Sequence, residues 1–134
     1  MILSHTTIGS IGEYITAAAI LSLGWKVAIA QQDYLDLVAF YDNRFLRIQV
    51  KTATLSCRPN RTPGYQFQNT SGSKKKILTP NKHDILVHCA LNHRRCVFYA
   101  SHTINQLTKR YPGTYFENES IEQESWNKAL ELVL

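Results

Sequence analysis

Three side chains in the middle of the chain are of the types that together make up a metal-assisted hydrolytic site. Asp36 lies in the segment YLDLVAFY, and Gln49 and Lys51 lie in the segment RFLRIQVKT. Carboxylate and amide oxygens are hard ligands suited to Mg²⁺, which retains several waters and bridges to phosphate groups. An ammonium group can position an attacking water and offset charge on phosphoryl oxygens. These residue types indicate metal-assisted phosphoryl hydrolysis, and the alternative is a salt bridge on an exposed sheet face.

These two segments are predicted to be strands that bring the three side chains together. Asp42 and Asn43 separate the strands and tolerate left-handed turn geometry. With a two-residue turn, Asp36 lies across from Gln49 with Cβ atoms about 4.5–5.5 Å apart, and Lys51 follows on the same face. The opposite face is apolar and is predicted to join the core, through Leu35, Leu37, Ala39, Leu46, Ile48 and Val50.

The elements before this hairpin are predicted to be a helix and a short strand. Residues 7–23 form the helix, because small and apolar residues recur at helical spacing and Gly24 is placed to end it. Residues 25–30 form the strand. The recurring positions are Ile8, Ile11, Ile15, Ala18, Ala19 and Leu23.

The elements after the hairpin complete one α/β domain over residues 1–134. The segment from Ser56 to Lys82 is predicted to be a long basic loop or extended hairpin, in which YQFQN could be a short strand. Two further strands flank the turn NHRR. Ser101 and Ser120 can each cap a helix, the first running through Arg110 and the second to the C-terminus. The expected architecture is a mixed central sheet of about five strands flanked by helices.

Composition and charge favour a compact nucleic-acid-binding protein. The chain has 134 residues, 44% of them hydrophobic, and its start lacks the basic and apolar regions of a signal peptide. Its three cysteines show no close pairing, so we expect a reducing, cytoplasmic location with no membrane association. The span from Asn43 to His83 contains basic residues and no acidic ones, which fits either a phosphate backbone or a solvated face. Its basic residues are Arg44, Arg47, Lys51, Arg58, Arg61, Lys74, Lys75, Lys76 and Lys82.

The pattern of Asp36 followed, thirteen positions later, by Gln-x-Lys resembles the signature of the PD-(D/E)XK nuclease superfamily. The stretch IGEYITAAAILSLGWKV and then LDLVAFYDNRFLRIQVKTA is similar to a subgroup of small nucleases that includes a group I intron-encoded homing endonuclease of cyanobacteria. The resemblance covers residues 8–53 through specific motifs and residues 84–100 more loosely. It implies a restriction-endonuclease-like core.

The resemblance also implies roles for four residues. Asp36 is the principal metal ligand, Gln49 a ligand through its side-chain oxygen, Glu13 an additional carboxylate near the metal, and Lys51 the water-positioning residue. The implied cofactor is Mg²⁺, with Mn²⁺ able to substitute and no zinc. Because Gln49 is neutral, metal affinity should be weaker than in a site with a second acid. Glu13 has an alternative role, since Ser10 and Glu13 fit a helix capping box.

The implied activity is hydrolysis of double-stranded DNA by a site-specific, homing-type endonuclease that acts as a homodimer or homotetramer. The alternatives are a structure-specific nuclease, such as a Holliday-junction resolvase, and an inactive DNA-binding relative. No small-molecule substrate is expected. The candidate DNA contacts are Arg44, Arg47, Arg58, Arg61, Lys74, Lys75, Lys76 and Lys82.

Two other groups of residues suggest further functions. His88, Cys89, His93 and Cys96 lie close together, but neighbouring residues on a strand point to opposite faces and their spacing matches no common zinc module. The aromatic residues of YQFQN either stack on bases or pack against the protein.

Overall fold

The computed structural model describes residues 2–32, 35–71, 76–77 and 82–134. Its helices are α1 (His5–Ser22) and α2 (Ile121–Val133), with short 3₁₀ helices η1 (Ser101–Thr103) and η2 (Gly113–Glu117). Its strands are β1 (Lys26–Gln32), β2 (Leu35–Tyr41), β3 (Arg44–Ala53), β4 (Gly64–Gln68), β5 (Thr70–Ser71), β6 (Lys76–Ile77), β7 (Ile85–Ala90), β8 (Arg95–Ala100) and β9 (Thr108–Pro112).

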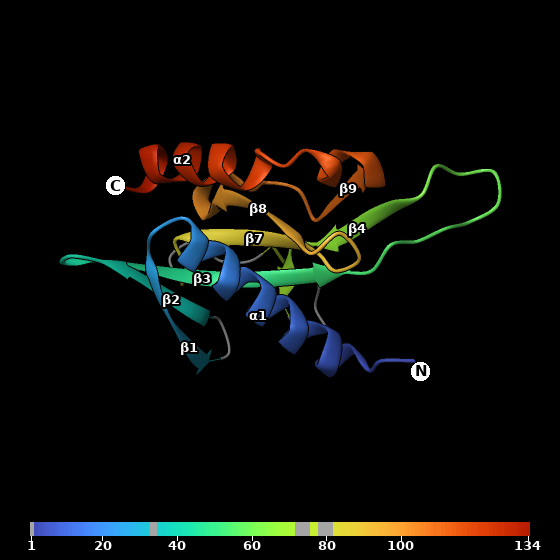
Figure 1. Ribbon diagram of the computed structural model, residues 1–134. Coiled ribbons are helices and arrows are strands. Elements are labelled where there is room, and N and C mark those ends of the chain that lie inside the picture. The colour runs from blue at the N-terminus through green and yellow to red at the C-terminus, as the bar shows by residue number, and fades with distance from the viewer. Residues whose placement is uncertain (1, 33–34, 72–75, 78–81) are drawn as a thin grey trace.

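A mixed five-stranded sheet forms the centre of the fold, as predicted. Its strand order is β1-β2-β3-β7-β8. Strands β3 and β7 are parallel, and the other neighbours are antiparallel. The predicted hairpins β2–β3 and β7–β8 are both present. Helix α1 crosses one face of the sheet, while α2 runs along the β8 edge (Figure 1).

Helix α1 begins and ends at positions that its flanking residues determine. The hydroxyl oxygen of Ser4 accepts a hydrogen bond from the Thr7 N–H at 3.2 Å, which caps the N-terminus. At the other end Gly24 adopts a φ of 94°, a left-handed conformation that glycine adopts without strain. Midway along the helix, a Cβ on Gly12 would lie 1.8 Å from Thr52 Oγ1, so glycine permits close packing on β3. No helix of the described residues is long and apolar enough to cross a membrane.

The core between α1 and the sheet contains the predicted apolar face of the β2–β3 hairpin. Leu37, Ala39, Leu46, Ile48 and Val50 are all buried in this cluster, together with residues of α1 and with Trp126 of α2. Burial of an aliphatic side chain of this size contributes about 1.5–3 kcal/mol to folding. The cluster fixes which face of the hairpin points inward, and so fixes the direction of the alternating polar side chains.

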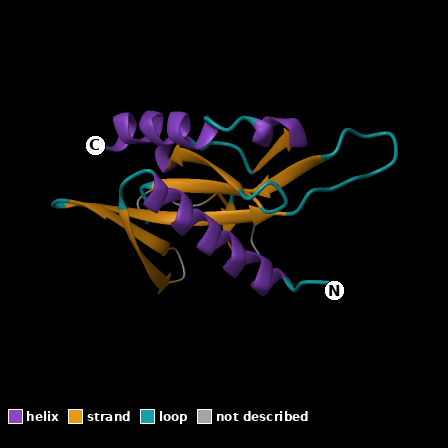
Figure 2. Cartoon of the chain, in the orientation of Figure 1, coloured by secondary structure: helices purple, strands orange, loops and turns teal. Residues whose placement is uncertain are grey.

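Part of the opposite face of the sheet carries a second layer that the sequence did not predict as such. Strands β4 and β9 pair antiparallel at one end of the sheet (Figure 2), where they and η2 pack against β3, β7 and β8. Tyr65 and Phe67 of β4 are fully buried in a second hydrophobic cluster, so the base-stacking hypothesis for these rings is wrong. The segment 56–82 is therefore only partly a loop, because it contains β4 and the short β5–β6 pair.

The predicted helix from Ser101 through Arg110 is wrong. The chain makes a single 3₁₀ turn at η1 and then continues extended into β9. The reason is long-range pairing: Tyr111 lies opposite Tyr65 of β4 and is buried with Phe67 and Phe116. Tertiary packing of these aromatic side chains outweighs local helix preference.

Helix α2 is present as predicted and protects an edge of the sheet. The side chains of Glu122 and Ser125 accept hydrogen bonds from the main-chain N–H groups of Cys96 and Phe98, at 2.9 and 3.0 Å. These N–H groups belong to β8, the outermost strand of the sheet. An uncovered edge strand exposes such donors to other chains, so the helix satisfies them and closes that edge.

Candidate active site

The predicted register of the β2–β3 hairpin is confirmed. The ladder of paired residues ends where the candidate site begins. The ladder runs as far as the pairing of Leu37 with Ile48. Beyond it the direct pairing predicted for Asp36 and Gln49 is not part of the ladder. Instead, the Val50 N–H donates a 2.8 Å hydrogen bond to the Asp36 carboxylate. The strands separate here, and a carboxylate takes the place of a main-chain acceptor.

Glu13 meets Asp36 at this opening from the helix side. The two carboxyl groups share a hydrogen bond, and the pKa of Glu13 is raised to about 7 by burial, by the charge of Asp36 and by that bond. Burial also raises the pKa of Asp36, while the Val50 N–H, Glu13 and Lys51 oppose the shift. Paired carboxylates with raised pKa values are typical of functional sites.

The capping-box alternative for Glu13 is wrong. Helix α1 starts at His5 with Ser4 as its N-cap, so Ser10 and Glu13 lie inside the helix. Glu13 is therefore one of the residues that the structure brings to Asp36.

Gln49 is buried with one polar atom unsatisfied. Its exposed fraction is 8%, and its side-chain oxygen has no hydrogen-bond partner within the part of the chain that the structure describes. Leaving a buried acceptor unpaired costs about 1–3 kcal/mol. A side-chain oxygen in this state fits the chemistry of a ligand to a hard cation, and its strand, β3, is the one whose Val50 N–H bonds the Asp36 carboxylate.

Lys51 is half-buried, and its ammonium is fixed by the main chain. Its Nζ donates a 2.8 Å hydrogen bond to the Thr70 carbonyl oxygen. Burial lowers the pKa of Lys51, and attraction to Asp36 partly opposes this. The salt-bridge alternative is therefore wrong, because the Lys51 ammonium donates to a carbonyl oxygen and Asp36 affects it only through its charge.

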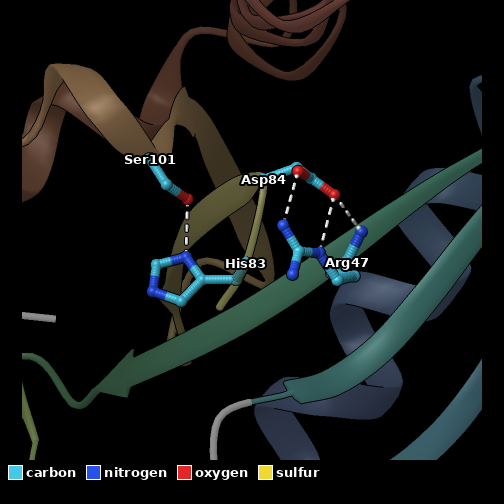
Figure 3. A network of polar contacts seen from close by, with 4 residues as sticks. All are labelled: Arg47, His83, Asp84 and Ser101. Atoms are coloured by element: carbon cyan, nitrogen blue, oxygen red, sulfur yellow. Dashed lines mark hydrogen bonds and ion pairs between the residues drawn. The ribbon is translucent and has the colours of Figure 1, made fainter. Parts of the chain in front are cut away.

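Arg47 of β3 forms an ion pair with Asp84, the residue before β7. The Arg47 guanidinium lies 3.1 Å from Asp84 Oδ1, and the Arg47 main-chain N–H donates to Oδ2 at 2.8 Å. Figure 3 shows the guanidinium directed at this carboxylate. Arg47, a predicted DNA contact, is therefore engaged by a side chain from the start of β7.

His83 is a candidate site residue that the sequence analysis missed. It is 2% exposed, its Nδ1 contacts the Ser101 hydroxyl at 2.5 Å, and its Nε2 has no partner among the described residues (Figure 3). Burial, followed by the positive charges of Arg47 and Lys51, lowers its pKa to about 4, with Asp84 opposing. The ring is therefore neutral at pH 7. Only the folded chain places it near Lys51, so no local signal could have identified it.

The predicted basic DNA contacts lie at two ends of the sheet. Arg44 is exposed at the tip of the β2–β3 hairpin, whereas exposed Arg58 and Arg61 lie in the loop after the far end of β3 (Figure 1). Lys82 is also exposed. Lys74 and Lys75 lie outside the described residues, as does the side chain of Lys76.

The candidate zinc residues point to opposite faces, as the alternation indicated. His88 is fully buried in the layer beneath β4, with its ring nitrogens bonded to the Tyr111 hydroxyl at 2.8 Å and to Asn69 Oδ1 at 2.6 Å. Cys89 and Cys96 are buried on the α1 side. The His88 ring therefore holds the second layer onto the sheet.

The two buried histidines predict a loss of stability in mild acid. Burial lowers the pKa of His83 to about 4 and that of His88 to about 3, below the ordinary value of 6.5. Below pH 6.5 the unfolded chain binds protons that these rings in the folded chain do not, so stability falls as the pH decreases. The loss should approach about 3 kcal/mol per ring near pH 4. Glu13 has the opposite effect on stability. Its pKa is raised to about 7, so below pH 7 the folded chain binds a proton there more readily than the unfolded chain.

Urea unfolding at several pH values between 7 and 4 measures this effect. His83→Gln should make the decline shallower, whereas His102→Gln, which alters an exposed histidine, should leave it unchanged. An identical decline in the wild type and His83→Gln would contradict the assignment.

Comparison with known proteins shows the family and the fold of the chain. A family model described as PD-(D/E)XK endonuclease matches residues 3–124. The solved structure of a bacterial homing endonuclease, I-Ssp6803I, matches with a TM-score of 0.71 and 17% sequence identity, covering 96% of this chain and 95% of that chain. At this identity the second match shows a shared fold. None of the curated proteins matches the sequence.

Proposed function

The chain belongs to the PD-(D/E)XK endonuclease family, and from this premise we propose that it is a Mg²⁺-dependent endonuclease that hydrolyses double-stranded DNA. The observation that carries the proposal is the meeting of Glu13 of α1 and Asp36 of β2 where the β2–β3 ladder ends, together with the unsatisfied oxygen of Gln49 on the adjacent strand β3. Oxygen ligands of this kind suit Mg²⁺.

The donor set fits such a cation. No cluster of three His, Cys, Asp or Glu side chains occurs in the described ranges, so the two carboxylates need a third ligand of another type. The buried oxygen of Gln49 supplies it. When bound, Mg²⁺ would stabilise charge on the phosphoryl oxygens and lower the pKa of a water. Glu13, Asp36 and Gln49 would hold it.

Lys51 would orient the attacking water. Its Nζ is fixed by the Thr70 carbonyl and attracted by Asp36, so the charge stays at one place beside the carboxylates. An ammonium preorganised in this way orients an attacking water and stabilises negative charge that develops on the phosphate.

The finer proposal is a site-specific, homing-type enzyme that cuts both strands. The fold likeness to a bacterial homing endonuclease over nearly the whole of both chains supports it. The described residues contain one such candidate site, so cutting both strands calls for two copies in a homodimer or homotetramer.

Incubation with supercoiled plasmid and Mg²⁺ tests the function. We expect nicking and linearisation that stop when the metal is chelated and resume when Mg²⁺ or Mn²⁺ is added in excess. Cleavage of a random-sequence library should select a long defined site. Preferential cleavage of branched over linear duplex would assign the protein to the structure-specific class, and binding without any cleavage would make it an inactive relative.

Substituting Gln49 should change the metal requirement. Gln49→Glu adds a negative charge to the ligand set, so the Mg²⁺ concentration for half-maximal cleavage should fall about tenfold or more, equivalent to about 1.4 kcal/mol. Gln49→Leu removes the oxygen while keeping a side chain of similar size, so the Mg²⁺ concentration for half-maximal cleavage should rise. Thermal stability measured against Mg²⁺ concentration gives a second readout that does not depend on turnover. A Mg²⁺ dependence that is the same in all three proteins would rule out Gln49 as a ligand.

A further inference from the structure

A positively charged pocket lies beside the candidate active site, beyond the end of β3. Its volume is about 330 Å³, and it opens between the first turns of α1, the end of β3 and the strands β4 and β9. Three arginines, Arg58, Arg61 and Arg110, and His5 contribute to its lining. No acidic side chain of the described residues lines it.

The side chain of Arg110 is held at this pocket by specific contacts. Its Nη2 donates a 2.9 Å hydrogen bond to the Thr62 carbonyl oxygen. A Cβ on Gly64 would lie 2.6 Å from Arg110 Nη1, so glycine leaves the space that the guanidinium fills. The loop that carries Arg58 and Arg61 is closed by two hydrogen bonds between Ser56 and Gly64, at 2.8 and 3.1 Å. These contacts hold the Arg110 guanidinium at the pocket and close the loop that carries Arg58 and Arg61.

The pocket and the candidate active site share two elements. On β3, Thr52 lines the pocket and directly follows Lys51. On α1, Ile8 and His5 line the pocket, while Glu13 lies further along the same helix. With a rise of 1.5 Å per residue, Glu13 lies about 8–12 Å along the helix from Ile8 and His5. Since B-DNA rises about 3.4 Å per nucleotide, this spacing corresponds to about two to four nucleotides.

We propose that this pocket binds a backbone phosphate of the cleaved DNA strand, about two to four nucleotides from the bond that is cut. The proposal rests on the proposed nuclease function and adds to it a second binding site and a residue, Arg110, that the sequence had placed in a helix. Guanidinium groups bind phosphate oxygens through paired, charge-assisted hydrogen bonds. The N-terminus of α1 adds a favourable dipole. The pocket orients the strand and takes no part in the chemistry.

Substituting Arg110 tests the phosphate site apart from catalysis. Binding of a labelled random-sequence duplex is measured over a range of salt concentrations in an Asp36→Asn background, where cleavage is blocked. Arg110→Gln should weaken binding about tenfold and reduce the slope of log K against log salt by about 0.9, the value for one phosphate contact. Arg61→Gln leaves the hydrogen bond between Arg110 and the Thr62 carbonyl in place. It should also weaken binding and reduce the salt slope. Lys128→Gln, an exposed charge on α2, should leave the slope unchanged.

A second measurement locates the phosphate. After the cut position has been mapped, phosphates near it are replaced one at a time by uncharged methylphosphonates. Binding should weaken at a phosphate about two to four nucleotides from the cut, and that loss should disappear in Arg110→Gln because the contact is already gone. A position outside this range overturns the proposal.

The two proposals fail in different ways. If the wild type cleaves DNA but Arg110→Gln keeps its affinity and salt slope, the pocket is wrong and the nuclease assignment stands. If Arg110→Gln lowers the slope but the wild type cleaves no DNA, the phosphate site stands and the nuclease assignment is wrong.

Discussion

Asp36→Asn is expected to slow plasmid cleavage in Mg²⁺ by about 10³-fold or more, while DNA binding stays within about twofold of the wild type. The first figure corresponds to about 4 kcal/mol of transition-state stabilisation, which is in the range that a principal metal ligand supplies. Asparagine keeps the size of the side chain and an oxygen that can accept the hydrogen bond from Val50. The variant therefore removes the negative charge while retaining the contact that positions residue 36.

The matched control is Asp42→Asn, the same chemical change in the same hairpin. Asp42 is exposed in the turn, with a φ of 53° that asparagine tolerates, so cleavage should be unchanged. Single-turnover rates and gel-shift affinities of the two variants separate chemistry from binding. If Asp36→Asn cleaves at the rate of the wild type, Asp36 has no catalytic role, and the family membership of the chain would then describe only its fold.

The part of the site that the sequence could predict depends on local rules. A two-residue turn and strict alternation determine the register of β2 and β3, and both are visible within twenty residues. The same rules could not show that the ladder stops at Leu37, because strand separation depends on what lies beside the strands. The contact of Asp36 with the Val50 N–H, and its proton sharing with Glu13, follow from that separation.

The features that the sequence missed depend on contacts between distant segments. Strand β9 exists because Tyr111 is buried against β4, more than forty residues earlier in the chain, and its own residues are compatible with a helix. Arg110 is carried to the basic pocket by this pairing. His83 is buried through its contact with Ser101, which is likewise remote in sequence. Hydrophobic periodicity reports which face of an element is buried, but not which partner covers it.

Lys51→Gln is the second substitution with a large expected effect, and its cause differs from that of Asp36→Asn. Glutamine is neutral but retains a donor for the Thr70 carbonyl, so the local structure should persist. We expect the single-turnover cleavage rate at saturating DNA to fall about 10²- to 10³-fold, equivalent to about 3–4 kcal/mol. The Mg²⁺ concentration for half-maximal cleavage should stay near that of the wild type, because Lys51 is not a ligand.

This combination distinguishes a water-positioning lysine from a structural one. A structural role for Lys51 predicts a lower free energy of urea unfolding together with lost activity, whereas the catalytic role predicts lost activity at nearly unchanged stability. Lys26→Gln, at an exposed position on β1, controls for the loss of one positive charge and should affect the rate little. If Lys51→Gln and Lys26→Gln cleave at the same rate, the attacking water is activated without Lys51, and Glu13 becomes the next side chain to test as the acceptor of its proton.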